Sequence, residues 1–159
     1  MNSVTLTVKK LSVYNEVAKT TAYAGAKMEG DDKAYERIFT TEKDRSMLER
    51  FWSEACNAAT DTFKPFITSV SNKVTVGNDT EDAYSVELEL SSMFDTNLQG
   101  SIEASLFSFF VASIVAKWCK FTDKQETESY TNDAESSMRD IKSKIYYRKK
   151  PTRMAPPVG

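Results

Sequence analysis

Side chains able to do chemistry are few in this chain, and the commonest of them is missing. The 159 residues include no histidine, which is the usual general base and the usual transition-metal ligand. No Ser-His, Cys-His or zinc–histidine site can therefore be built from this chain alone. Glycine-rich phosphate loops and activated-serine motifs are also absent from the sequence. We expect no cofactor, no metal and no enzyme activity, and an enzyme that uses only carboxylates or tyrosines stays an open alternative.

Two further sets of residues could carry chemistry. Cys56 and Cys119 lie far apart without a CxxC motif, so we expect two buried free thiols, with a disulfide left open. Glu87 and Glu89 share one face of a predicted strand, where paired carboxylates could act as acid and base or bind Mg²⁺. Their alternation with apolar residues is explained more simply as the solvated face of a hairpin.

The basic C-terminus is the strongest candidate for binding. From Arg139 onward the chain has seven basic residues and one acidic residue, a formal charge of +6 in a protein of net charge −2. Such a segment could contact phosphate, enter an acidic groove of a partner protein, or be an exposed helix end. Tyr146, Tyr147 and Met154 add apolar anchors that suit a protein interface. The candidate partner-binding residues are Tyr147, Arg148, Lys149, Lys150, Pro151, Arg153, Met154, Pro156 and Pro157.

The elements that position these residues are mostly helices. Apolar spacing and capping residues predict helices from Ser12 to about Lys27, Thr41 to Pro65, about Thr96 to Cys119, and Thr122 to about Tyr147. One amphipathic turn is predicted around Tyr35, Ile38 and Phe39. The third long helix is apolar almost all round, so it should be central. Its small side chains would let another backbone approach closely, at Ser101, Ser105, Ser108, Ala112 and Ala116.

Two regions alternate with the period of a strand. Residues 4–8 predict a short N-terminal strand, and residues 70–76 and 84–90 predict a hairpin around a Gly77-Asn78-Asp79 turn. If Val76 pairs with Tyr84 and Val74 with Val86, then Lys73 lies opposite Glu87.

The predicted fold class is mainly α (α+β). It is an antiparallel bundle of about four helices with a β-hairpin over about 70–90 and a short N-terminal strand. Residues 1–147 form one domain, and residues 148–159 form an extended, basic, proline-rich arm. The most apolar stretch, residues 104–116, is shorter than the roughly 20 residues that span a bilayer, so we expect a buried helix and no membrane. The N-terminus lacks a signal-peptide pattern, and we expect synthesis inside the cell.

The combination of these features resembles a known class of virion proteins. The segments LERFWSEACNAAT, YSVELELSSMFDTNL and IYYRKKPTRMAPP are similar to small proteins of Bacteroides phages, and the whole resembles the head–tail connector (neck adaptor) proteins of tailed bacteriophages. The resemblance implies a virion protein, made in the cytoplasm of the host bacterium. It also implies a ring, commonly of twelve copies, beneath the portal, with the arm from Tyr147 to Gly159 embedded in the portal and DNA passing through the ring.

Other functions stay open beside this one. One alternative is a tail terminator or another tail or neck protein. A second alternative is a nucleic-acid-binding module whose cations are Lys142, Lys144, Arg148, Lys149 and Lys150.

Overall fold

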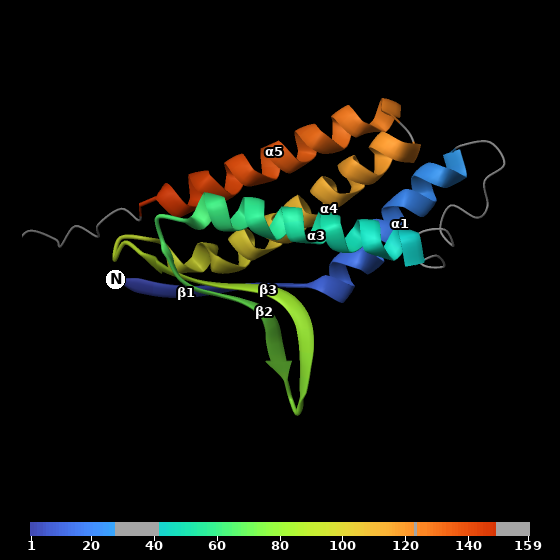
Figure 1. The fold of residues 1–159 in the computed structure, drawn as a ribbon. Helices are drawn as coiled ribbons and strands as arrows, with labels where there is room; N and C mark the ends of the chain where they lie inside the picture. The colour runs from blue at the N-terminus through green and yellow to red at the C-terminus, as the bar shows by residue number, and fades with distance from the viewer. Residues whose placement is uncertain (28–41, 123, 149–159) are drawn as a thin grey trace, which may run out of the picture.

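A computed structural model describes residues 1–27, 42–122 and 124–148 (Figure 1). In these residues the chain forms four α-helices and a three-stranded antiparallel sheet, which confirms a fold of mixed helix and strand. The amphipathic turn predicted around Tyr35, Ile38 and Phe39 lies outside the described residues. In chain order the elements are β1 (Asn2–Lys9), α1 (Lys10–Lys27), α3 (Glu42–Phe63), β2 (Ile67–Val76), β3 (Asp79–Leu90), the short 3₁₀ helix η1 (Thr96–Leu98), α4 (Gln99–Thr122) and α5 (Lys124–Tyr146).

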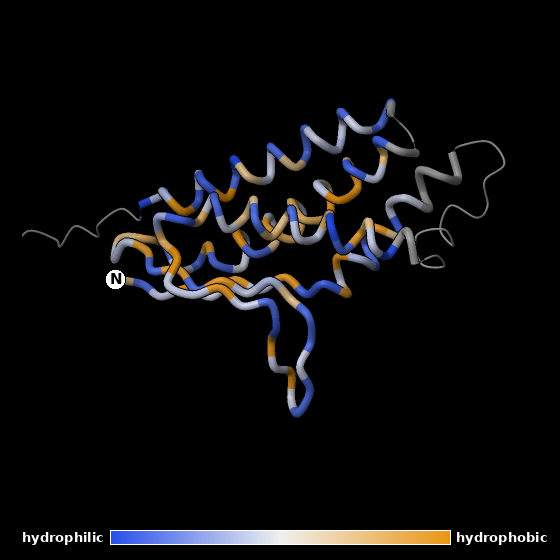
Figure 2. Tube along the Cα trace, in the orientation of Figure 1, coloured by the Kyte–Doolittle hydropathy of each residue, from blue (hydrophilic) through white to orange (hydrophobic). Residues whose placement is uncertain are grey.

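The sheet has the strand order β1-β3-β2 and buries one face under the helices (Figures 1 and 2). Residues Val4, Leu6 and Val8 of β1 point into the core, because alternate side chains of a strand share a face. They pair across the ladder with Leu88, Val86 and Tyr84 of β3, which are also buried. The predicted N-terminal strand is thus an edge strand of this sheet.

Helix α4 lies at the centre of the helical layer, where it contacts β1, α1, α3 and α5. Its Phe110 side chain is fully buried, with ring centroids 4.8 Å from Trp52 of α3 and 5.5 Å from Tyr84 of β3. By length and composition alone, Thr96–Lys120 could cross a membrane, and 56% of its most apolar window is buried inside the fold. Its charged residues also make internal contacts: Glu103 accepts a hydrogen bond from the Thr7 amide, and Lys117 pairs with Glu54 at 2.7 Å. These contacts support a core helix.

Helix α5 folds back along α4 after a very short link (Figure 1). The two helices approach at one of the small side chains, because the Ser105 hydroxyl of α4 donates to a carboxylate oxygen of Asp140, 2.6 Å away. Lys144, one turn further along α5, donates to the same carboxylate and to Ser105. A small polar residue on α4 therefore forms a hydrogen-bonded contact as well as a close approach.

The predicted register of the hairpin is wrong. Val76 pairs with Asp79 and Val74 with Glu81, whereas we expected Tyr84 and Val86 as their partners. Gly77 adopts a φ of 63°, a left-handed conformation that glycine tolerates, so the chain reverses in a tight turn over residues 77–78. This turn sets the register near the tip. Lys73 consequently lies opposite Asp82, 3.4 Å away, and Glu87 lies opposite Ser69.

Three predicted helix boundaries also need correction. Ser12 lies inside α1, which begins at Lys10 because the pairing of β1 with β3 ends at Lys9. Asp95, and not Thr96, caps the next helical segment: its carboxylate accepts a hydrogen bond from the Asn97 amide at the start of η1. Thr122 is the last residue of α4, so it does not begin α5. Thr41 lies outside the described residues.

Candidate functional site

The distal half of the hairpin projects from the sheet as a two-stranded ribbon (Figure 1). We call residues 70–82 the hairpin arm; Val70 and Ser71 form its base, where they pair with Val86 and Ser85 in the three-stranded part of the sheet, and residues 73–82 form the two-stranded part. The ladder between β1 and β3 ends at the Lys9–Ala83 pair, so beyond this point β3 pairs with β2 alone. Every residue of the arm is exposed except Val74, which is half-buried. An isolated two-stranded hairpin is marginally stable in water, so such an arm gains from contact with another surface.

Hydrophobic and hydrophilic residues lie together on the hairpin arm (Figure 2). Val70 and Val76 are 47% and 43% exposed. Asp79, Glu81 and Asp82 outnumber the single cation of the arm, Lys73. The arm therefore presents exposed valines in a net negative surface.

Ion pairs hold the base of the arm to the body. Lys9 lies 3.5 Å from Glu81, and Lys10 contacts both Glu49 of α3 and Asp82, the latter at 3.9 Å. Exposed pairs of this kind each stabilise by roughly 0–1 kcal/mol, but together they restrict the direction in which the arm leaves the sheet.

A second exposed surface lies where α5 ends. The backbone of Arg148 forms an antiparallel bridge with Phe94, which brings Met93 and Tyr147 to the same end of the molecule. The Asn2 side chain donates to the carbonyl oxygens of Ser91 and Phe94, so Met1 lies at this end too. We call this surface the terminal patch. It consists of Met1, Met93, Tyr146, Tyr147 and Arg148, all of them exposed.

Arg148 fixes the root of the predicted C-terminal arm. One guanidinium nitrogen donates to the carbonyl oxygen of Ile145 at 2.9 Å and to that of Tyr147 at 3.3 Å. A cation at this position satisfies carbonyl groups that the end of a helix leaves without partners. The ring of Tyr146 packs edge-on against Phe66, with centroids 5.7 Å apart. Helix α5 therefore ends in a fixed geometry.

Only two of the predicted partner-binding residues can be placed, Tyr147 and Arg148, and both belong to the terminal patch. The other seven lie outside the described residues: Lys149, Lys150, Pro151, Arg153, Met154, Pro156 and Pro157. Nothing in the described part of the chain tests their predicted role.

Burial makes two potential nucleophiles, the Cys56 thiol and the Tyr14 hydroxyl, less reactive. Cys56 and Cys119 are free cysteines, Cys119 buried and Cys56 half-buried. Burial raises the pKa of the Cys56 thiol to about 12. Burial also raises the pKa of the Tyr14 hydroxyl far above its usual value, with a further increase from the nearby Glu49 carboxylate. Both groups are therefore protonated at neutral pH.

Carboxylates do not assemble into a metal centre within residues 1–27, 42–122 and 124–148, where no group of three ligating side chains was found. Glu87 accepts a hydrogen bond from the Ser3 hydroxyl across the sheet, at 3.2 Å. Glu87 and Glu89 are exposed on the sheet face away from the core, as expected for a solvated face. Glu87 and Glu89 therefore belong to a polar outer surface of the sheet.

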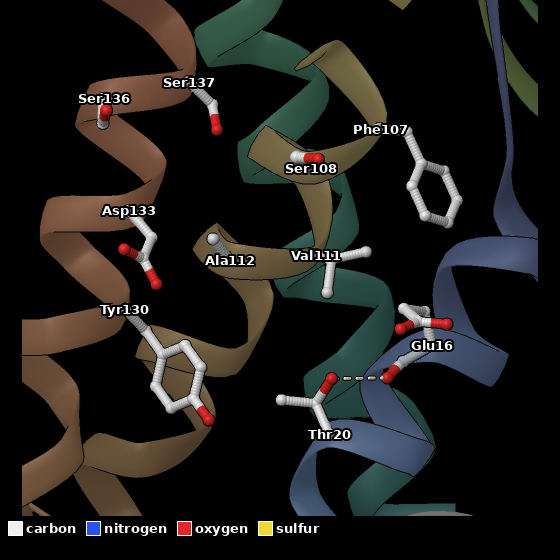
Figure 3. A pocket seen from close by; sticks show the side chains of 10 residues that line it. All are labelled: Glu16, Thr20, Phe107, Ser108, Val111, Ala112, Tyr130, Asp133, Ser136 and Ser137. Atoms are coloured by element: carbon white, nitrogen blue, oxygen red, sulfur yellow. Dashed lines mark hydrogen bonds between the residues drawn. The ribbon is translucent and has the colours of Figure 1, made fainter. Parts of the chain in front are cut away.

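A shallow groove of about 440 Å³ opens between α1, α4 and α5 (Figure 3). Phe107 and Val111 form its apolar part, and the carboxylates of Glu16 and Asp133 lie on opposite sides of it. The Thr20 hydroxyl already donates a hydrogen bond within α1, to the Glu16 carbonyl oxygen at 2.8 Å. The groove combines carboxylates, hydroxyls and apolar carbon.

Sequence patterns missed the hairpin arm as a surface. The alternation of Val70, Val74 and Val76 predicted a buried face, whereas two of these valines are exposed. The informative signal was the acidic run from Asp79 to Asp82, which breaks the apolar alternation of β3 just before Tyr84.

A scan against protein-family models and searches of curated proteins and solved structures found no match.

Proposed function

We propose that this chain is a structural protein of a bacteriophage virion: a head–tail connector subunit that forms a ring in the neck. It docks on the portal through residues 148–159 and performs no catalysis. One observation carries the proposal: the basic C-terminal segment begins at a fixed root, Arg148. Arg148 is held by a backbone bridge to Phe94 and by hydrogen bonds to the end of α5. Because the root is already ordered, less conformational entropy is lost when the segment binds a partner.

The contacts and neighbours of Arg148 favour a protein partner over free nucleic acid. Lys144 and Arg148, two of the cations assigned to the nucleic-acid alternative, already donate to groups within the fold. The root is surrounded by exposed apolar side chains, Met93, Tyr146 and Tyr147, which suit the core of a protein interface. A tail terminator receives less support, since that class is built on a larger sheet than three strands.

Deletion of residues 149–159 tests the docking. The variant keeps Arg148, and therefore the root. We expect the truncated chain to lose co-purification with the portal protein of the same phage while its own solution mass distribution stays unchanged. Matched full-length variants separate the causes: Lys149→Ala with Lys150→Ala and Arg153→Ala removes charge, and Pro151→Ala with Pro156→Ala and Pro157→Ala removes conformational restriction.

Three results would count against the proposed function. Undiminished portal binding by the truncated chain would refute docking through the arm. Electron microscopy of virions carrying a labelled chain would refute the neck assignment if the label lies elsewhere. Duplex binding that falls steeply with added salt, without any portal binding, would instead favour the nucleic-acid module.

A further inference from the structure

Exposed large apolar side chains gather in two separate regions of the described chain. Four of them, Met1, Met93, Tyr146 and Tyr147, form the terminal patch with Arg148. Val70 and Val76 lie on the hairpin arm, and Leu11 borders the pocket at the base of the arm beside Glu81 and Asp82. Among residues 1–21, 45–120 and 125–148, no other large apolar side chain is exposed. Exposed apolar groups that gather in this way mark interaction surfaces.

The two regions are complementary in charge. The hairpin arm carries three carboxylates and one ammonium group, a formal charge of −2. At the terminal patch Arg148 is exposed, and Lys142, also exposed, lies one turn before Tyr146 on α5. Opposite charges around apolar centres orient two surfaces and speed their association.

The two regions lie at different places on one molecule. Figure 1 shows the arm extending from the sheet on the side away from the helices, whereas the N-terminus and the end of α5 lie together at one end of the body. The arm of one copy therefore meets the patch of another copy in a heterologous contact, in which the two subunits use different surfaces. Repetition of such a contact by rotation closes a ring or extends a filament.

We propose that the hairpin arm of each copy binds the terminal patch of the next copy, and that this contact closes the ring. The occupant of the arm is thus a second copy of this chain. Val70 and Val76 pack against Tyr146, Tyr147 and Met93, while Asp79 and Glu81 face Arg148 and Lys142. The inference rests on the proposed ring-forming function and names the surfaces through which its subunits meet.

Charge reversal on each surface provides the test. The arm variant is Asp79→Lys with Glu81→Lys, and the patch variant is Lys142→Glu with Arg148→Glu. Each alone places like charges at the contact, and we expect self-association to weaken by about tenfold or more in sedimentation and light-scattering measurements. A chain that carries all four substitutions regains opposite charges at the contact and should regain the mass distribution of the unmodified protein.

Controls separate a lost contact from a lost fold. Glu128→Lys with Glu135→Lys makes the same charge change as the arm variant on exposed positions of α5 away from both surfaces, and it should leave assembly unchanged. The thermal unfolding midpoint of every variant is measured alongside. A second arm variant, Val70→Ser with Val76→Ser, removes apolar contact without a change of charge and should also weaken self-association.

Several outcomes overturn the inference. It fails if the unmodified chain is monomeric at the highest attainable concentration. It also fails if either reversal leaves assembly intact, or if the four-substitution chain stays dissociated while folded. These results are distinct from failure of the proposed function. Portal binding that depends on residues 149–159 would survive an interface elsewhere, and charge-restored assembly without portal binding would refute the connector role alone.

Discussion

The two halves of β3 belong to one continuous strand, yet only one half is part of the core. Residues from Ala83 to Leu90 pair with β1, those from Ser85 to Leu88 also pair with β2 on the other side, and their inward side chains are buried. Residues from Asp79 to Asp82 pair with β2 alone and are exposed. The difference arises where β1 gives way to α1 at Lys10, because β3 loses its neighbouring strand there and the hairpin bends away from the helices (Figure 1). A strand can therefore serve as scaffold at one end and as a contact surface at the other.

Truncation of one side chain in each half should give the largest contrast. Leu88→Ala removes a side chain with 0% exposure from the core, and we expect a loss of roughly 2–5 kcal/mol in the free energy of unfolding. Val76→Ala on the arm should change the same quantity by less than about 0.5 kcal/mol. Denaturant titrations of the two variants, at protein concentrations where the chain is monomeric, measure both values. A similar loss in both variants would show that the arm packs against the body.

The turn at the tip of the arm provides a second contrast. Gly77→Ala places a Cβ at a φ of 63° with no atom within 4 Å, so its cost is backbone strain alone, about 1–2 kcal/mol. Gly100→Ala, in the first turn of α4, meets open space without positive φ and should stabilise the protein by up to about 1 kcal/mol.

Hydrogen exchange shows where the strain at Gly77 acts. Faster exchange confined to amides of the arm is the expected result for Gly77→Ala, and Gly77→Asn should largely restore protection, because asparagine tolerates this conformation. Equal acceleration in the Ala83–Leu90 half would mean that the two halves open as a single unit.

Much of the core half was predictable from local pattern. The alternation of Val4, Leu6 and Val8 and of the residues from Tyr84 to Leu90 identified the inward faces, since both strands bury one side. On α3 the helical spacing of Leu48, Trp52, Ala55 and Ala59 puts these buried side chains on one face, and Pro65 lies just beyond the end of that helix at Phe63.

The arm was less predictable, because its valines are not buried and so give no information on register. The tight turn at Gly77 sets the register instead, because its left-handed conformation fixes which residues of the two strands pair. Matching apolar faces alone does not predict that conformation. The terminal patch depends on contacts distant in sequence, such as the bridge between Phe94 and Arg148, which no local periodicity encodes. The exposed surfaces of this protein are therefore set by where neighbouring strands and helices end.

The smallest contrast concerns one ion pair in each region. Asp140 in the body receives hydrogen bonds from Lys144 and Ser105, and these lower the pKa of its carboxyl below the ordinary value of 3.8. Because the folded state favours the ionised form, the pair stabilises the protein above this value, and the benefit is lost as the pH falls through the lowered pKa. Asp82 on the arm pairs with Lys73 at 3.4 Å, with both side chains more than half exposed.

Asp140→Asn should therefore lower the free energy of unfolding by a few tenths to about 1 kcal/mol at neutral pH. The deficit should begin to shrink below about pH 4, where the unfolded chain binds a proton at this carboxyl, and should vanish as the pH falls through the lowered pKa of the folded protein. Asp82→Asn should lower the same quantity by less at neutral pH, because its ion pairs with Lys73 and Lys10 lie at the surface. Urea titrations from neutral to acidic pH measure both variants. A deficit for Asp82→Asn as large as that for Asp140→Asn would show that the arm is held as firmly as the helices, which would weaken the case that it is built for contact with a second copy.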